Sequence, residues 1–311
     1  MSWGHGFSFS RFKIAAGEYS GHIAMLLEGQ AGCKPVLQIY TAAGKLVSQH
    51  LWKDAPPVAL GWSVSEDLVV VQKSGFASIL DLSGNYVRRF SMGQEAEQRD
   101  IVDVKFFTMH NHTGLAVLTG GNHIFVNTNI ETPHVRRLAE LPGPTQPLTY
   151  WLIVPGPLSL THTPKSESDG FSGPWALVAK KKLLYRADYA NVDMVDLSLL
   201  LPHNSAQIEL MAVSPNLKFI SFYLDCGLLL VTNLRMSEVL SLVDLTQRIS
   251  TSPDPENPAK NQTMSTPLAM FWSTSSAVVL HWHHLVALVG AQGDVYEYFF
   301  QDDVWLAQEV G

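Results

Sequence analysis

Hydrophobic and polar positions alternate in short runs along residues 58–84, VALGWSVSEDLVVVQKSGFASILDLSG. Every second position of 58–64 is apolar, which indicates a strand with one buried face, and the continuous run 68–71 indicates a strand buried on both faces. A third strand is expected at 76–82. A more polar fourth strand at 86–92 is typical of a sheet edge. Turn residues separate the four runs, so the pattern predicts an antiparallel four-stranded sheet.

Runs of the same kind recur along the whole chain. They read GHIAMLLE, VLQIYTAAG and LVSQHLWK; IVDVKFF, GLAVLTGG, HIFVNTN and VRRLAEL; TYWLIVPG, WALVAKK, KLLYRAD and MVDLSLL; IELMAVS, FISFYLD, LLLVTNL and VLSLVDL; PLAMFWS, AVVLHWH, LVALVGA and DVYEYFF. A period of about 40–50 residues without long amphipathic helices predicts an all-β fold, a β-propeller of about six four-stranded antiparallel blades. A lone sheet leaves both faces exposed, so each blade needs its neighbours.

The alternative fold is a pair of β-sandwiches, which also consist of short strands and turns but do not require units of constant length. Two segments interrupt the repeat. Residues 159–174 and 248–267 are rich in serine, proline and polar residues, and we expect long surface loops there. We treat residues 1–311 as one β-propeller domain.

Composition excludes several classes of protein. The 311 residues are 46% hydrophobic and 16% charged, with a net charge of −7, so a core is expected and a nucleic-acid-binding surface is not. Two distant cysteines, Cys33 and Cys226, and a start without signal-peptide character favour a reducing, cytoplasmic location. The longest apolar runs are shorter than the roughly 20 residues of a membrane-spanning helix.

The histidines are the first candidates for chemistry. His281 and His283 alternate along a predicted strand next to His284, and His110 and His112 stand in HNH. Residues that alternate on a strand share a face, which would suit a metal. We favour structural histidines, because no cysteine or carboxylate stands at a recognisable ligand spacing. No metal and no cofactor is predicted.

Acidic pairs are the second candidates. Asp302–Asp303 and Glu66–Asp67 resemble the carboxylate pair of a glycosidase, but neighbouring strand residues point to opposite faces and both pairs fall in predicted turns. The chain also lacks a G-x-S-x-G element, and GLAVLTGGNH lacks the strand-to-helix context of a phosphate loop. We predict no catalytic residues, and an enzyme that uses the propeller channel is kept only as an alternative.

Tryptophans are the residues that we expect to hold the blades together. Large rings in or beside strands fill the space between neighbouring sheets, a role that we favour over ligand stacking. The strongest candidates for this blade-interface role are Trp62, Trp52, Trp151 and Trp272, with Trp175 and Trp282 in similar positions.

A family resemblance is carried by residues 35–121. The ordered set IY-x-x-x-G, LGWS, L-x-x-V-Q, DL-x-G and FSMG resembles the N-terminal region of the vacuolar protein sorting-associated protein 16 family. LMAVSPNLKFISFYLD and VVLHWHHLVALVG fit the same family pattern further along. The resemblance implies a non-enzymatic scaffold subunit of the class C tethering complexes HOPS and CORVET, which act in membrane fusion and protein transport to the lysosome or vacuole.

The resemblance also implies partners and a place in the cell. Members of the family contact other class C subunits and are peripheral on late endosomal and lysosomal or vacuolar membranes. A helical solenoid after the propeller holds their SNARE-chaperone partner. This chain stops at QDDVWLAQEVG, so we expect a fragment or short isoform in which the solenoid is absent and the ring of blades is incomplete. The competing interpretation is a propeller adaptor of another trafficking complex.

Overall fold

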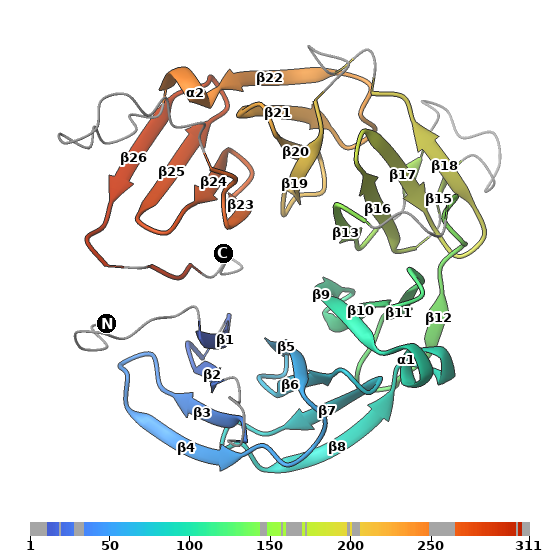
Figure 1. Ribbon diagram of the computed structural model, residues 1–311, viewed down its shortest axis with the longest axis vertical. Coiled ribbons are helices and arrows are strands. Elements are labelled where there is room, and N and C mark those ends of the chain that lie inside the picture. The colour runs from blue at the N-terminus through green and yellow to red at the C-terminus, as the bar shows by residue number, and fades with distance from the viewer. Residues whose placement is uncertain are drawn as a thin grey trace. The chain divides into compact units, whose positions relative to one another are not determined.

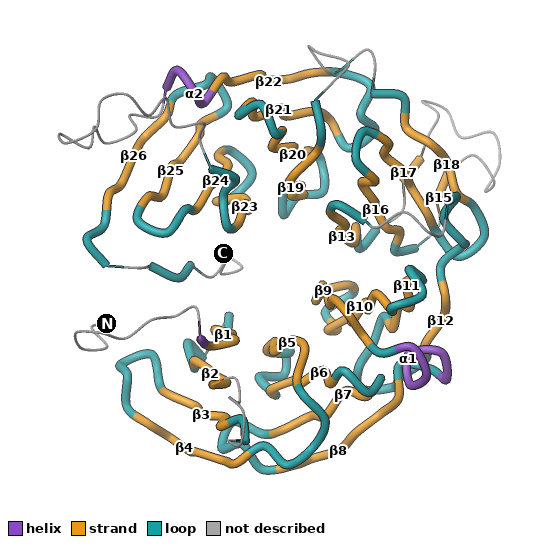
Figure 2. The backbone as a smooth tube through the Cα atoms, in the orientation of Figure 1, coloured by secondary structure: helices purple, strands orange, loops and turns teal. Residues whose placement is uncertain are grey.

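A computed structural model of the chain describes residues 11–18, 20–27, 34–143, 148–156, 158–159, 170–171, 173–197, 200, 206–248, 265–302 and 304–306. These residues divide into two compact units, Met1–Thr145 and Gln146–Glu309. Strands dominate both units, and α-helix within the ranges just given is confined to two short segments (Figures 1 and 2).

The first unit contains three four-stranded antiparallel sheets among its described residues. The strands are β1 (Phe12–Ala16), β2 (Ile23–Leu27), β3 (Val36–Tyr40), β4 (Leu46–Leu51), β5 (Pro57–Trp62), β6 (Leu68–Gln72), β7 (Phe76–Leu80), β8 (Tyr86–Ser91), β9 (Ile101–Met109), β10 (His112–Thr119), β11 (Ile124–Asn127) and β12 (Val135–Arg137). Each sheet follows the chain order, β1 to β4, β5 to β8 and β9 to β12. The helix α1 (Gln94–Arg99) lies between the second and third sheets in sequence.

The second unit repeats this arrangement in its described part. Its strands are β13 (Tyr150–Val154), β14 (Leu158–Ser159), β15 (Gly170–Phe171), β16 (Trp175–Lys180), β17 (Leu183–Ala187), β18 (Val192–Val195), β19 (Ile208–Val213), β20 (Phe219–Leu224), β21 (Leu228–Asn233), β22 (Val239–Asp244), β23 (Ala269–Ser273), β24 (Ala277–His281), β25 (Leu285–Gly290) and β26 (Val295–Phe299). The sheets are β13-β16-β17-β18, β19 to β22 and β23 to β26. The helix α2 (Leu245–Arg248) follows β22.

One of the two loops expected from the sequence differs in the structure. A small ladder joins Leu158–Ser159 to Gly170–Phe171, so part of the expected loop 159–174 is strand. The rest of that segment, except Gly173 and Pro174, lies outside the described residues. The same holds for 249–264 of the expected loop 248–267. Two strands are inserted between β13 and β16 because this connection folds back on itself.

The hydrophobic cores lie between consecutive sheets. All side chains of the run 68–71 are fully buried, as its apolar pattern predicts. Leu68 and Val70 pack toward the β1–β4 sheet, whereas Val69 and Val71 pack toward the β9–β12 sheet. The same alternation builds two cores in the second unit, one on each side of the β19–β22 sheet. Strand alternation therefore places one strand in two cores, which explains why central strands read as continuous apolar runs.

Outer strands carry the exposed residues of each sheet. The strand β8 lies at the edge of its sheet, as its polar pattern predicts, and Tyr86 and Val87 are more than half exposed. Arg89 covers the ring of Phe76, with 3.8 Å from its guanidinium carbon to the ring centroid. Charged side chains on an edge strand discourage pairing with other chains.

Candidate interaction site

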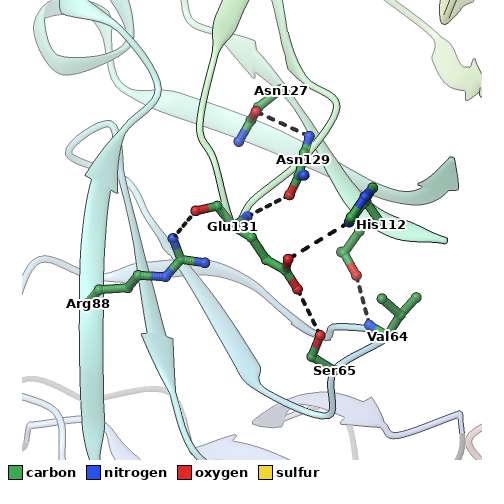
Figure 3. A network of polar contacts seen from close by, with 8 residues as sticks. Val64, Ser65, Arg88, His112, Asn127, Asn129 and Glu131 are labelled. Atoms are coloured by element: carbon green, nitrogen blue, oxygen red, sulfur yellow. Dashed lines mark hydrogen bonds and ion pairs between the residues drawn. The ribbon is translucent and has the colours of Figure 1, made fainter. Parts of the chain in front are cut away.

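A group of polar side chains joins two sheets at the surface of the first unit (Figure 3). It consists of Ser65, Arg88, His112 and Glu131, and we call it the Glu131 cluster. Ser65 lies in the turn between β5 and β6, Arg88 on β8, His112 at the start of β10 and Glu131 in the loop between β11 and β12. The cluster therefore connects the β5–β8 sheet to the β9–β12 sheet.

Glu131 is the centre of the cluster through both its side chain and its backbone. The Ser65 hydroxyl donates to its Oε1 at 2.9 Å, and His112 Nδ1 lies 3.9 Å from its Oε2. Arg88 Nη1 donates to the Glu131 carbonyl oxygen at 2.6 Å. Next to these contacts, the Val64 amide donates to the Thr113 hydroxyl at 2.8 Å. Several bonds of moderate strength thus join the same two sheets at one point.

Asparagine side chains shape the loop that presents Glu131. Asn127 is fully buried, and its Oδ1 accepts hydrogen bonds from the amides of Asn129 and His134. Asn129 Oδ1 in turn accepts from the Glu131 amide at 2.8 Å. Short asparagine side chains bond nearby backbone in this way and so close turns. Ile130 in the same loop is 2% exposed, and its side chain anchors the loop in the hydrophobic core.

The electrostatics of the cluster are those of a surface rich in acids. Burial raises the pKa of Asp67, in the same turn as Ser65; Arg88 opposes that shift, and Asp81 and Glu131 add to it. The side chains of His112 and Glu131 are 45% and 49% exposed, so half of each remains accessible to another molecule. Half-exposed polar groups on a supported surface suit the polar rim of a protein–protein contact.

A second polar group holds α1 against the third sheet. Glu95 Oε1 lies 2.5 Å from His123 Nδ1 and accepts from the Thr119 hydroxyl at 3.3 Å. Arg137 Nη1 lies 3.9 Å from the other oxygen of Glu95. These contacts tie the helix to the β10–β11 turn and to β12. The role of Glu95 is therefore to position the helix.

The four tryptophans singled out from the sequence are all buried, with relative exposures of 9% or less. Trp62 on β5 donates its ring N–H to the carbonyl of Ala15 on β1 at 3.1 Å. Trp272 on β23 makes the equivalent bond to Ala212 on β19 at 3.2 Å. In both cases the ring links the first strand of one sheet to the first strand of the preceding sheet.

The other two tryptophans are placed differently. Trp52 follows β4, and its ring N–H donates to the Ala55 carbonyl at 2.8 Å, within its own connection. Trp151 lies in β13 and is 3% exposed. That Trp52 and Trp151 contribute to the blade interfaces stays a prediction. The same holds for the blade-interface role predicted for Trp62 and Trp272.

The histidine and carboxylate candidates do not converge in the described part of the chain. His110 and Asn111 both have positive φ, and they form the two-residue turn between β9 and β10, where such residues are favoured. His281 is buried at the end of β24. Across the described residues, no group of three histidine, cysteine or carboxylate side chains is arranged to hold a metal ion.

The acidic pairs have separate surroundings. Glu66 and Asp67 lie in the β5–β6 turn, Glu66 with φ +64°. Asp302 is exposed, and its neighbour Asp303 lies outside the described residues. Sequence reasoning missed Glu131 and Arg88 as partners, since 43 positions separate them. The only local signal was the N-x-N-x-E spacing of 127–131, which marks a turn but not what the turn meets.

Comparison with known proteins identifies a family. The family model described as "Vps16, N-terminal region" matches residues 1–311. Protein VACUOLELESS1 of Arabidopsis thaliana is 23% identical over 330 aligned residues, which cover 99% of this chain and 35% of that protein. The vacuolar protein sorting-associated protein 16 homolog of Drosophila melanogaster is 26% identical over 147 residues, 45% of this chain and 18% of the homolog. The chain thus spans about a third or less of the length of these relatives.

Solved structures support the fold class. The crystal structure of BBS1N in complex with ARL6DN aligns with a TM-score of 0.60 at 12% identity, covering 96% of this chain and 84% of that one. The β-propeller domain of Cps50 (Swd1) from Myceliophteria thermophila aligns with a TM-score of 0.55 at 11% identity, covering 93% and 86%. At these identities the likeness concerns the fold alone, and it confirms the predicted β-propeller.

Proposed function

The chain belongs to the family of Vps16 N-terminal regions, and we propose that it is a non-enzymatic scaffold that binds other subunits of the class C tethering complexes HOPS and CORVET. The match of the family model to residues 1–311 carries this proposal. Relatives named for vacuolar protein sorting support a role in protein transport to the vacuole or lysosome.

The proposed place of action is the cytoplasmic surface of late endosomes and lysosomes or vacuoles. In the described part of the chain, no helix has the length and apolar character needed to cross a bilayer. Attachment to the membrane through the other subunits of the complex is our proposal. We propose that contact with the SNARE-chaperone subunit requires sequence of the longer relatives outside the N-terminal region that this chain matches.

We assign one subunit contact to the Glu131 cluster. The cluster presents the half-exposed Glu131 carboxylate on a loop held by Asn127 and Asn129, so a partner meets a surface that is already ordered. Preorganised surfaces lose less entropy on binding. A reversed charge at Glu131 would also place a cation beside Arg88 and His112.

The test is a binding experiment with purified subunits. We expect the immobilised chain to retain at least one class C subunit other than the SNARE-chaperone, and Glu131→Arg to weaken that binding at least tenfold. Glu238→Arg is the matched control, because Glu238 is exposed on the second unit and has the same change in charge. Retention of no class C subunit by the wild-type chain would refute the scaffold proposal, and equal loss in both variants would refute the assignment to the cluster.

A further inference from the structure

An apolar hollow of about 90 Å³ lies between the β19–β22 and β23–β26 sheets of the second unit. Its walls include Leu229, Val231, Leu240, Trp272, Val278 and Val289, and serines 241, 275 and 276 stand among the lining residues. Pockets for cofactors and metabolites are about 300–1,000 Å³. This hollow is smaller, and its size suits a single apolar side chain.

The walls of the hollow are held in place by the core behind them. The Trp272 ring is fixed by its bond to the Ala212 carbonyl, and it stacks on Phe219 with 6.0 Å between ring centroids and 24° between planes. Leu229, Val278 and Val289 are at most 3% exposed. The hollow is therefore formed before any ligand arrives, which lowers the entropic cost of filling it.

The outer strand beside the hollow has an exposed apolar surface. Leu240, which lines the hollow, is 44% exposed, and Leu242 on the same strand is 46% exposed. Their strand, β22, is at the edge of its sheet. It differs from β8, which carries two arginines, because its one charged residue is Asp244, at its end. An edge strand whose central residues are uncharged accepts an added extended segment more readily than one with charges along its length.

The charge on the other wall indicates what kind of segment fits. After Lys260 the chain contains five acidic residues and no lysine or arginine, so the formal charges of the β23–β26 sheet are all negative. Asp294 is the acid beside the hollow: its Oδ2 lies 3.6 Å from the position of a Cβ on Gly290, a lining residue. An apolar hollow with a carboxylate beside it complements an apolar side chain next to a basic one.

We propose that this hollow docks an extended segment of another protein, which inserts one side chain of leucine, methionine or phenylalanine and carries a lysine or arginine toward Asp294. The serine hydroxyls lining the hollow are suited to bond the backbone of the segment. The site is on the second unit, whereas the Glu131 cluster is on the first, and it does not depend on the class C assignment.

The first experiment uses a displayed library of random twelve-residue peptides selected against the chain. We expect an enriched pattern with one large apolar residue flanked by lysine or arginine. A synthetic peptide of that pattern should lose at least tenfold in affinity when its apolar residue is changed to alanine. No enrichment, or an acidic pattern, would overturn the proposal.

Variants of the chain locate the site. Ser276 is an exposed lining residue, so Ser276→Trp should block the hollow and weaken peptide binding at least tenfold without disturbing the core. Ser83→Trp is the matched control, at an exposed serine in the β7–β8 turn of the first unit. Equal binding by wild type and Ser276→Trp would show that the peptide binds elsewhere and would sink the assignment.

The charge contribution is tested by Asp294→Asn and Asp294→Lys. Both variants should bind the basic peptide more weakly than the wild-type chain does, and the lysine variant should lose more affinity. The affinity of the wild-type chain should fall as the salt concentration is raised. Asp302→Lys makes the same charge change at an exposed residue of the same region that does not line the hollow, and it should have a smaller effect. If sedimentation showed a dimer of the chain that Ser276→Trp abolishes, the occupant would be a second copy and the proposal would be wrong.

Discussion

Single side chains in this protein join consecutive sheets by contacting residues that are distant in sequence. Trp62 and Trp272 each donate a ring N–H to a carbonyl on the first strand of the preceding sheet, 47 and 60 positions away. The ring fills the core and its N–H satisfies a backbone acceptor, so one residue supplies both packing and a directional bond. Glu131 likewise makes two kinds of contact: its side chain accepts a bond from the β5–β6 turn, and its carbonyl oxygen accepts one from β8.

Replacement of Trp62 tests this double role. We expect Trp62→Ala to lower the free energy of unfolding by about 3–5 kcal/mol, the usual range for emptying a buried aromatic site. Trp62→Phe should cost less, about 1–3 kcal/mol, because the Ala15 carbonyl then loses its donor. Trp305→Ala is the control, at a ring that is 38% exposed, and should stay within about 0.5 kcal/mol. Chemical denaturation measures all three, and an unchanged midpoint for Trp62→Ala would show that the ring does not support the core.

Two aspartates of the β5–β8 sheet should respond to pH in opposite directions. Burial raises the pKa of Asp67 above its ordinary value of 3.8, whereas bonds from the side chain and amide of Asn85 lower the pKa of Asp81. Ionised Asp67 therefore destabilises the fold, and this penalty develops as pH rises from 3.8 through its raised pKa. Ionised Asp81 stabilises the fold above pH 3.8, and this is lost as pH falls through its lowered pKa.

The matched variants are Asp67→Asn and Asp81→Asn. At pH 7 we expect the first to be more stable than wild type and the second to be less stable. Below the pKa of each group both differences should shrink, the Asp67 difference at the higher pH. Thermal unfolding between pH 3 and pH 7 measures this, and differences that do not change with pH would contradict the assigned causes.

Elements that connect the sheets are short and are positioned by close contacts. The helix α1 has six residues, too few to be stable alone. It is held by the buried Ala96, by the bonds of Glu95 to the β10–β11 turn and by the turn around Gly75. A Cβ on Gly75 would lie 2.6 Å from the Glu97 amide nitrogen. The helix therefore depends on a glycine at that position.

Gly75→Ala should destabilise the protein for two reasons. The residue has φ +89°, which disfavours alanine by about 1–2 kcal/mol, and the new methyl group would collide with the α1 backbone, which cannot turn away as a side chain can. Gly173→Ala is the matched control: Gly173 has φ +79°, and a Cβ there would lie 3.9 Å from the Tyr189 ring, an ordinary contact distance, so the variant carries the backbone penalty alone. Equal losses of unfolding free energy in Gly75→Ala and Gly173→Ala would show that α1 moves to accommodate the methyl group.

The whole molecule is built by repetition of one sheet. In each compact unit, cores lie between consecutive sheets, so a sheet is stabilised mainly by its sequence neighbours. Helix is limited to α1 and α2 among the described residues. The interaction sites that we propose lie where sheets meet, because two sheets are needed to form the Glu131 cluster or the apolar hollow.

The far-ultraviolet circular dichroism of the chain should therefore be that of a β protein. We expect the single minimum that is typical of β-sheet and not the double minimum of α-helix, since the propeller fold consists of four-stranded sheets joined by connections. Spectra recorded before and after Trp62→Ala would show whether loss of this ring changes the fold or only its stability. A spectrum dominated by helix would refute the architecture.

Local pattern by itself determined the strands and their grouping. Alternation and turn residues placed the four strands of 58–92 within about two residues of β5 to β8, because side-chain direction and turn chemistry depend on neighbouring residues. The run 68–71 indicated burial on both faces for the same reason. The family motifs of 35–121 lie on these strands, on β3 and on the turns that follow them, and the family model agrees with them.

Tertiary structure decided which distant residues meet. The bond from Trp62 to Ala15, the contact of Arg88 with Glu131 and the hollow between β22 and β25 all join segments whose separation leaves no periodic signal in the sequence. The raised pKa of Asp67 likewise follows from burial, which a turn motif does not report. Strand formation is a local property of the chain, whereas contacts between sheets depend on how the sheets stack, and the candidate sites consist of such contacts.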